Sequence, residues 1–163
     1  IWIYRELYAK RLTADALADA IFEAEAFDPP MYASVLDKSC WNRVAGAPSV
    51  AQTMIQRGIR WLPSNSDRMS GKLELHKRLQ LNEDSGEPHL KIFSTCTNLV
   101  RTLPTIPLSR TNSEDVDTKS EDHAYDALRY LCMLRQINNT NFTGWSSRIK
   151  DTTPEPRDIV FGY

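Results

Sequence analysis

The sequence predicts an α/β protein with a largely parallel sheet that is covered by helices on both faces. Short apolar segments alternate with amphipathic segments along residues 1–137, as strands and helices do in parallel α/β folds. Most of the amphipathic segments follow a residue that can cap a helix. The chain has 163 residues, 41% of them hydrophobic, which is enough for one domain with a core of ordinary size.

The first expected elements are a strand, a helix and a second strand. The run IWIYRELYA at residues 1–9 is rich in β-branched and aromatic side chains and resembles a strand already under way, so we expect the chain to be part of a longer protein. Thr13 can cap a helix over residues 14–26. The apolar run MYASVLD at residues 31–37 predicts a buried strand with Asp37 at its exit.

The middle of the chain repeats this alternation. Ser49 can cap a helix that closes at Gly58, and the β-branched and aromatic residues of IRWLP predict a strand over residues 59–63. A third helix is expected over residues 67–81, and a further strand over residues 89–93. Functional groups in such folds gather at the carboxyl ends of the strands, which is where Asp37 is expected to lie.

The last part of the domain ends in the helix with the densest motif. A short helix is expected over residues 94–103, followed by a proline-rich loop. Thr118 and Glu121 have the spacing of a capping box for the final helix. The domain should end at residue 137, and residues 138–163 lose periodicity, so we expect a tail that is ordered only in part.

Composition excludes several classes of protein. The 20 lysines and arginines nearly balance the 21 aspartates and glutamates, so any contact with nucleic acid must come from a local patch. The three cysteines have no CxxC spacing, which argues against a disulfide framework or a zinc site. The apolar runs are far shorter than a membrane span, and we expect a cytoplasmic protein with no membrane partner.

The final helix and the exit of the second strand carry the candidate metal ligands. In SEDHAYDALRY, Asp122 and Asp126 lie one helical turn apart, and His123 shares their edge. Together with Asp37 they offer the oxygen ligands that Mg²⁺ or Mn²⁺ prefers. The structural alternative is that Asp122 favours a helix amino terminus, that Asp126 and His123 are solvated, and that Asp37 forms a turn.

A local basic stretch is the candidate DNA contact. Arg68 and Lys72 lie in the third expected helix near Gly71, where they could contact phosphate, although an exposed helix face explains them equally well. The chain has no GxxxxGK[ST] loop, so hydrolysis of ATP is not expected of this part of the protein.

The motifs resemble the carboxyl-terminal domain of bacteriophage large terminases over roughly residues 1–136. The resemblance is carried by YRELYAKRLTADALADAI, LDKSCWNR, SVAQTMIQRGI, SDRMSG, NLVRTLPTIP and, most specifically, EDVDTKSEDHAYDALRY. It implies a ribonuclease H-like fold, a mixed sheet with helices on both faces. It also implies a divalent-metal-dependent endonuclease that cuts concatemeric viral DNA during genome packaging, with Mg²⁺ or Mn²⁺ bound by acidic residues.

The resemblance also implies a role for single residues. Asp37 resembles the second catalytic aspartate of the family, Asp126 resembles the third, and His123 resembles a histidine that precedes it in some members. A two-metal site would place the carboxylates of Asp37 and Asp126 about 4 to 8 Å apart. Lys38 stands where the family commonly has proline, which puts a cation beside the ligand. The family's first aspartate lies on a strand ahead of residue 1, and Glu6 is not expected to replace it.

The partners implied are double-stranded viral DNA, the portal or prohead, the small terminase subunit and the protein's own ATPase domain, in the cytoplasm of the infected bacterial host. Two alternatives stay open. The chain could be a catalytically silent docking module whose tail, with Phe161 and Tyr163, meets the portal or prohead. It could also be another ribonuclease H-like enzyme, such as a resolvase or transposase.

Overall fold

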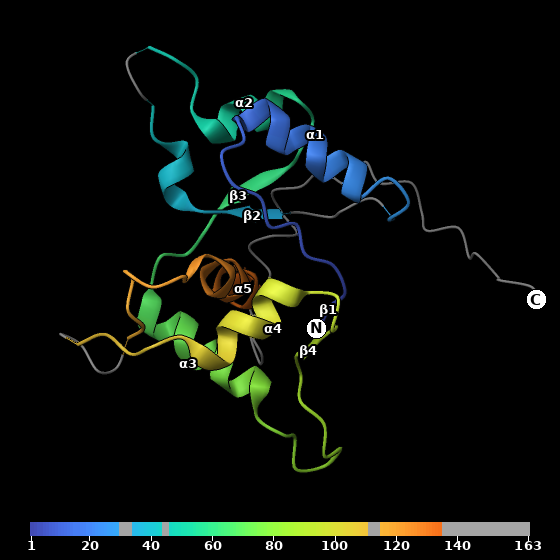
Figure 1. The fold of residues 1–163 in the computed structure, drawn as a ribbon, viewed down its shortest axis with the longest axis vertical. Helices are drawn as coiled ribbons and strands as arrows, with labels where there is room; N and C mark the ends of the chain where they lie inside the picture. Colours follow the sequence, from blue (N-terminus) through green and yellow to red (C-terminus); the bar gives the residue numbers. More distant parts are fainter. Residues whose placement is uncertain (30–33, 44–45, 111–114, 135–163) are drawn as a thin grey trace, which may run out of the picture.

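The computed structural model describes residues 1–29, 34–43, 46–110 and 115–134, and within these ranges the fold is mixed α/β (Figure 1). The elements, in chain order, are β1 (Trp2–Ile3), α1 (Ala14–Ala24), β2 (Ser34–Leu36), the 3-10 helix η1 (Lys38–Trp41), α2 (Val50–Gln56), β3 (Trp61–Pro63), α3 (Arg68–Leu79), β4 (Lys91–Ile92), α4 (Thr97–Thr102), the 3-10 helix η2 (Leu103–Thr105) and α5 (His123–Leu134).

The strands of the described ranges pair in parallel, as the alternating pattern predicts, but they form two separate pairs. β1 pairs with β4, and β2 pairs with β3, with Val35 opposite Leu62. The strand expected over residues 1–9 pairs only at Trp2 and Ile3, because the chain then leaves the sheet. The mixed α/β class is therefore confirmed. In place of the expected single sheet, the described residues form two short parallel pairs of strands.

Local capping explains where the first two helices begin and end. The Thr13 side chain accepts a hydrogen bond from the Ala16 backbone N–H at 3.2 Å, which starts α1 as predicted. Ser49 and Gln52 form a reciprocal capping box at the start of α2. After α2 the chain turns at Gly58, whose φ of +106° lies in the region that glycine adopts without strain.

The final helix begins later than its capping signal predicts. α5 starts at His123, and the Asp122 carbonyl accepts the first helical hydrogen bond, from the Asp126 N–H at 2.8 Å. The predicted capping box is wrong, because the Glu121 side chain makes other contacts. Its carboxylate accepts hydrogen bonds from the Arg101 guanidinium and the Tyr8 hydroxyl.

Two apolar clusters stabilise the described part of the chain. The larger one gathers side chains from α3, α4, α5 and the segments next to β4, and its buried members are Leu75, Leu90, Cys96, Leu99, Val116, Tyr125, Leu128 and Cys132. The smaller one lies between α1, α2 and the β2–β3 pair and buries Ala18, Met54 and Ile59. α5 packs against both α3 and β2, so it connects the two clusters (Figure 1).

The expected tail over residues 138–163, together with residue 137 where the domain was predicted to end, lies outside the described ranges. Among the helices that are described, none has the length and apolar character needed to cross a membrane.

Candidate functional site

Asp37 lies where the sequence predicts it, at the exit of β2. There the chain turns into η1, and the Asp37 Oδ1 accepts a hydrogen bond from the Ser39 backbone N–H at 2.7 Å. The other carboxylate oxygen, Oδ2, accepts a hydrogen bond from the hydroxyl of Tyr130 on α5. The strand-exit carboxylate is therefore attached to the last helix by a residue 93 positions away in the chain.

The Tyr130 contact places Asp37 at the face of α5 that carries the motif. Asp126 precedes Tyr130 by four residues, so both side chains lie on one face of the helix, about 5 to 6 Å apart at their Cβ atoms. The separation of about 4 to 8 Å between the Asp37 and Asp126 carboxylates stays a prediction of the two-metal arrangement.

Asp126 is held by a buried arginine that follows it on the same helix. The Arg129 Nη2 and Nε lie 3.0 and 3.2 Å from the Asp126 Oδ1, and Arg129 is only 1% exposed. Its stem crosses α3 at Gly71, where an added Cβ would lie 2.6 Å from the Arg129 Cγ. Gly71 thus makes room for the buried Arg129 side chain, and the Arg129 guanidinium orients Asp126.

Arg68, expected as a DNA contact, lies beside the same carboxylates. Its Nε donates a hydrogen bond to the Asp115 Oδ2 at 2.7 Å, and its Nη1 lies 3.5 Å from the Asp126 Oδ2. The Arg68 side chain is 27% exposed. Lys72, the other expected DNA contact, lies one turn further along α3 and is half-buried. Asp115 was not among the predicted site residues.

The pKa values of Asp122 and Asp37 are shifted in opposite directions. Burial raises the pKa of the Asp122 carboxyl above its usual value, and repulsion by Asp126 adds to the shift. Burial would also raise the pKa of Asp37, but hydrogen bonds from Ser39 and Tyr130 outweigh it and leave that pKa below its usual value. Asp37 is therefore held as a carboxylate, the form that binds a cation.

Burial and the hydrogen bond to Asp37 raise the pKa of Tyr130 to about 12. The Tyr130 hydroxyl consequently stays protonated at neutral pH and can act as the donor in this contact. A protonated donor and an ionised acceptor form a charge-assisted hydrogen bond, which is stronger than a neutral one.

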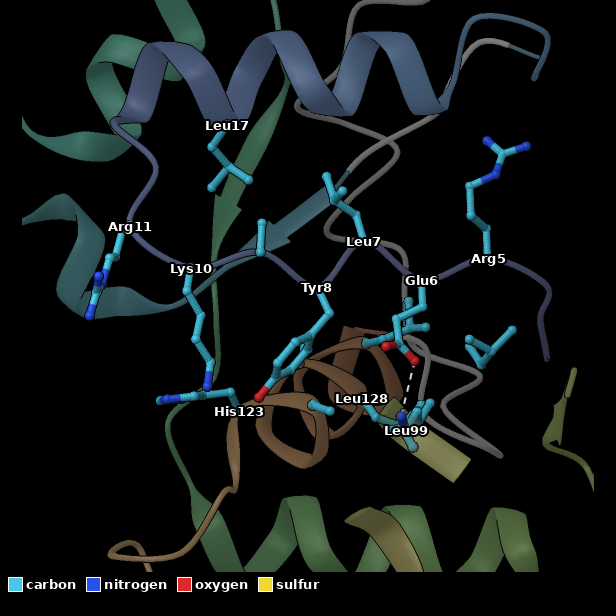
Figure 2. Close-up of a pocket in the computed structure, with 15 residues that line it drawn as sticks. Arg5, Glu6, Leu7, Tyr8, Lys10, Arg11, Leu17, Leu99, His123 and Leu128 are labelled. Carbon is cyan, nitrogen blue, oxygen red and sulfur yellow. Dashed lines mark hydrogen bonds between the residues drawn. The ribbon is translucent and has the colours of Figure 1, made fainter. Parts of the chain in front are cut away.

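His123 is exposed and lies beside Asp122, where it faces a pocket. It lines a pocket of about 740 Å³ between the extended segment after β1 and the apolar face of α5, where Tyr8 and Lys10 lie nearby (Figure 2). Its ring nitrogen Nδ1 is 3.9 Å from the Asp122 Oδ1. Asp37 and Asp126 are not among the residues that line this pocket. The ring is thus free of the core, as a proton-transfer role requires.

Glu6, which is not expected to replace the family's first aspartate, binds the start of α4. Its carboxylate accepts hydrogen bonds from the backbone N–H groups of Asn98 and Leu99, in the first turn of α4, at 3.1 and 3.0 Å. Figure 2 shows the hydrogen bond from Leu99. The negative charge also opposes the positive end of the helix dipole. Glu6 is therefore committed to α4 and does not join the aspartates.

The predicted ligands are of the chemical type that a hard divalent cation prefers. Asp37, Asp122 and Asp126 offer carboxylate oxygens, and Mg²⁺ commonly takes one or two carboxylates and keeps several waters. No group of three or more His, Cys, Asp or Glu side chains converges as a ready-made metal site within the described ranges. Both oxygens of Asp126 face guanidinium groups, so a cation there must compete with arginine.

Three residues that organise this region were not predicted from the sequence. Arg129 and Tyr130 follow Asp126 by three and four residues, a spacing that puts them on its side of a helix and could have drawn attention to them. Asp115 gave no such signal, because it lies in a polar loop and meets Arg68 only through the fold.

Comparisons of the chain with protein-family models, with curated proteins and with solved structures find no match. The assignment of a function therefore depends on the motifs and on the geometry described above.

Proposed function

We propose that this chain is the nuclease domain of a bacteriophage large terminase, which cleaves concatemeric viral DNA with Mg²⁺ or Mn²⁺ during genome packaging. The observation that supports this most is the hydrogen bond between Tyr130 and Asp37. It brings the strand-exit carboxylate to the helix face that bears Asp126, and the motif resemblance assigns metal binding to those same two residues. The ribonuclease H-like fold belongs to this proposal.

Under this proposal each residue has a defined task. Asp37 and Asp126 hold the cation, with Asp122 at the edge of the set, and Tyr130 keeps the Asp37 carboxylate in place. When bound, Mg²⁺ or Mn²⁺ supplies an activated water and stabilises charge on the phosphodiester. His123, exposed at the start of α5, lies beside Asp122 and is the candidate proton-transfer group.

The same proposal defines the partners. Double-stranded DNA is the substrate, and Arg68 and Lys72 are the candidate phosphate contacts on α3. The portal or prohead, the small terminase subunit and the protein's own ATPase domain are the assembly partners, in the cytoplasm of the infected bacterium.

Plasmid nicking in Mn²⁺ tests the activity. The assay uses this chain alone and the chain extended to its complete reading frame. Under the proposal, the protein that holds all three catalytic aspartates of the family should nick the plasmid. Asp37→Asn and Asp126→Asn should each reduce nicking by about 100-fold or more, since each removes a ligand charge from the cation.

Asp15→Asn is the matched control, because Asp15 is an exposed aspartate of α1, the helix that packs in the other apolar cluster. It should nick like the parent. Nicking that survives both Asp37→Asn and Asp126→Asn would refute the proposed site. A folded extended protein that never nicks DNA, yet binds the portal, would favour the silent docking module instead.

A further inference from the structure

The guanidinium of Arg68 lies between the carboxylates of Asp115 and Asp126. Its Nε is hydrogen-bonded to Asp115, and its Nη1 is 3.5 Å from Asp126. Burial and the charge of Asp126 raise the pKa of the nearby Asp122, and the charge of Arg68 opposes that shift. One arginine therefore neutralises carboxylates that come from the loop before α5 and from α5 itself.

We propose that Arg68 is an exchangeable counter-ion, which leaves Asp126 when a divalent cation binds and then contacts a DNA phosphate. This inference rests on the proposed function, because Asp126 is a cation ligand in that proposal and a partner of Arg68 in the structure. It makes Arg68 the residue that couples metal binding to DNA binding. The exchange involves ion pairs alone, so no covalent bond changes.

Charge balance favours an exchange over simple addition of a cation. Arg68 pairs with Asp115 and Asp126, and Arg129 pairs with Asp126, so both oxygens of Asp126 already face a positive charge. Departure of Arg68 frees one of those oxygens for a cation. A cation that arrived with Arg68 still in place would be repelled by it at short range.

Only one of the two arginines is placed to move. Arg129 is 1% exposed and its stem is fixed against Gly71, so it cannot reach solvent without opening the α3–α5 contact. The Arg68 side chain is 27% exposed and starts at the first residue of α3. Its buried Nη2 also has no hydrogen-bond partner in the described residues, a cost that the present arrangement carries and that an exchange can remove.

Phosphate is the partner that matches the freed group. A guanidinium can donate two parallel hydrogen bonds to phosphate oxygens, as it does to a carboxylate. Coupled equilibria are reciprocal, so if Mn²⁺ releases Arg68 to DNA, then DNA must tighten Mn²⁺ binding by the same factor.

Calorimetric titration of the printed chain with Mn²⁺ tests the inference. Arg68→Gln removes the charge and keeps a long polar side chain, so it should bind Mn²⁺ about fivefold tighter or more than the parent, within the usual range of coupling between sites. Arg68→Lys keeps the charge and should stay close to the parent. Arg57→Gln is the control, because Arg57 pairs with Asp15 and Asp19 on α1 and should leave Mn²⁺ binding unchanged.

A second measurement needs no variant. A short DNA duplex should tighten Mn²⁺ binding to the parent chain, and this effect should be lost in Arg68→Gln. Equal Mn²⁺ affinity in the parent and Arg68→Gln, or absence of Mn²⁺ binding in both, would overturn the exchange. The nicking assay is independent: loss of nicking in Asp37→Asn and Asp126→Asn would uphold the proposed function even if Arg68 proved to be a fixed counter-ion.

Discussion

Two segments of this molecule leave a parallel strand at its carboxyl end and carry a carboxylate, and they use it differently. After β1, Glu6 accepts two backbone N–H groups and the side-chain amide of Asn98 at the start of α4. After β2, Asp37 accepts hydrogen bonds from Ser39 and from the Tyr130 hydroxyl on α5. The first carboxylate completes a helix, and the second joins a strand exit to a distant helix.

The difference shows that position at a strand end does not by itself make a carboxylate functional. The donors to Glu6 all lie on α4, so this acid serves that helix alone. Asp37 accepts hydrogen bonds from Ser39 and from Tyr130, and Tyr130 lies on the helix that carries Asp126. The position of the donors therefore distinguishes a structural acid from a candidate ligand where the sequence pattern alone does not.

Glu6→Gln should have the largest effect on stability. The amide removes the charge that opposes the α4 dipole and turns an N–H toward the backbone donors of Asn98 or Leu99. Hydrogen bonds to charged groups are worth about 1.5 to 3 kcal/mol, so a loss of that size in the free energy of unfolding is expected in urea denaturation. Mn²⁺ affinity should not change. A loss below about 0.5 kcal/mol would contradict the capping role.

Asp37→Asn should show the reverse pattern. The carbonyl oxygen of the introduced side-chain amide can still accept a hydrogen bond from Ser39, and the Tyr130 hydroxyl can rotate to accept one from the amide nitrogen. The free energy of unfolding should therefore fall by about 1 kcal/mol or less. Mn²⁺ binding, measured by calorimetry, should weaken strongly. If the variant instead lost more stability than Glu6→Gln and kept its Mn²⁺ affinity, Asp37 would be the structural acid of the pair.

Local signals in the sequence predicted most of the helices. Thr13 and Ser49 begin α1 and α2 as expected, and Gly58 follows α2, because these capping interactions join residues at most a few positions apart. The exit of β2 at Asp37 was also predicted, from a run of apolar residues that ends in an acid. Such features depend on neighbours along the chain.

Long-range contacts set the features that the sequence did not predict. The strand expected over residues 1–9 pairs at two positions, since Glu6 and Tyr8 bind α4 and the start of α5 instead. Glu121 likewise accepts hydrogen bonds from Tyr8 and Arg101 and does not form the predicted capping box. Arg68 and Asp115 are 47 residues apart, and no local pattern indicates that they meet. Partners of this kind follow from the packing of α3 against α5.

The segment after β1 also reaches the start of α5, and this contact should have the smallest effect. Hydrogen bonds from Arg101 and then from Tyr8 lower the pKa of Glu121 from 4.5 to about 2. A carboxyl whose pKa is lower in the folded state stabilises the fold above its unfolded pKa and loses that contribution as the pH falls. The stabilisation by Glu121 should therefore be complete above about pH 5 and disappear as the pH falls toward 2.

An NMR titration of the Glu121 carboxyl carbon measures this directly. Arg101→Gln should move the midpoint most of the way back toward 4.5, because Arg101 is the largest cause of the shift, and Tyr8→Phe should move it less. The stability at pH 7 should change little in either variant, since the pair is exposed and screened by solvent. A midpoint that moves more in Tyr8→Phe than in Arg101→Gln would mean that the segment after β1, and not α4, holds the start of α5.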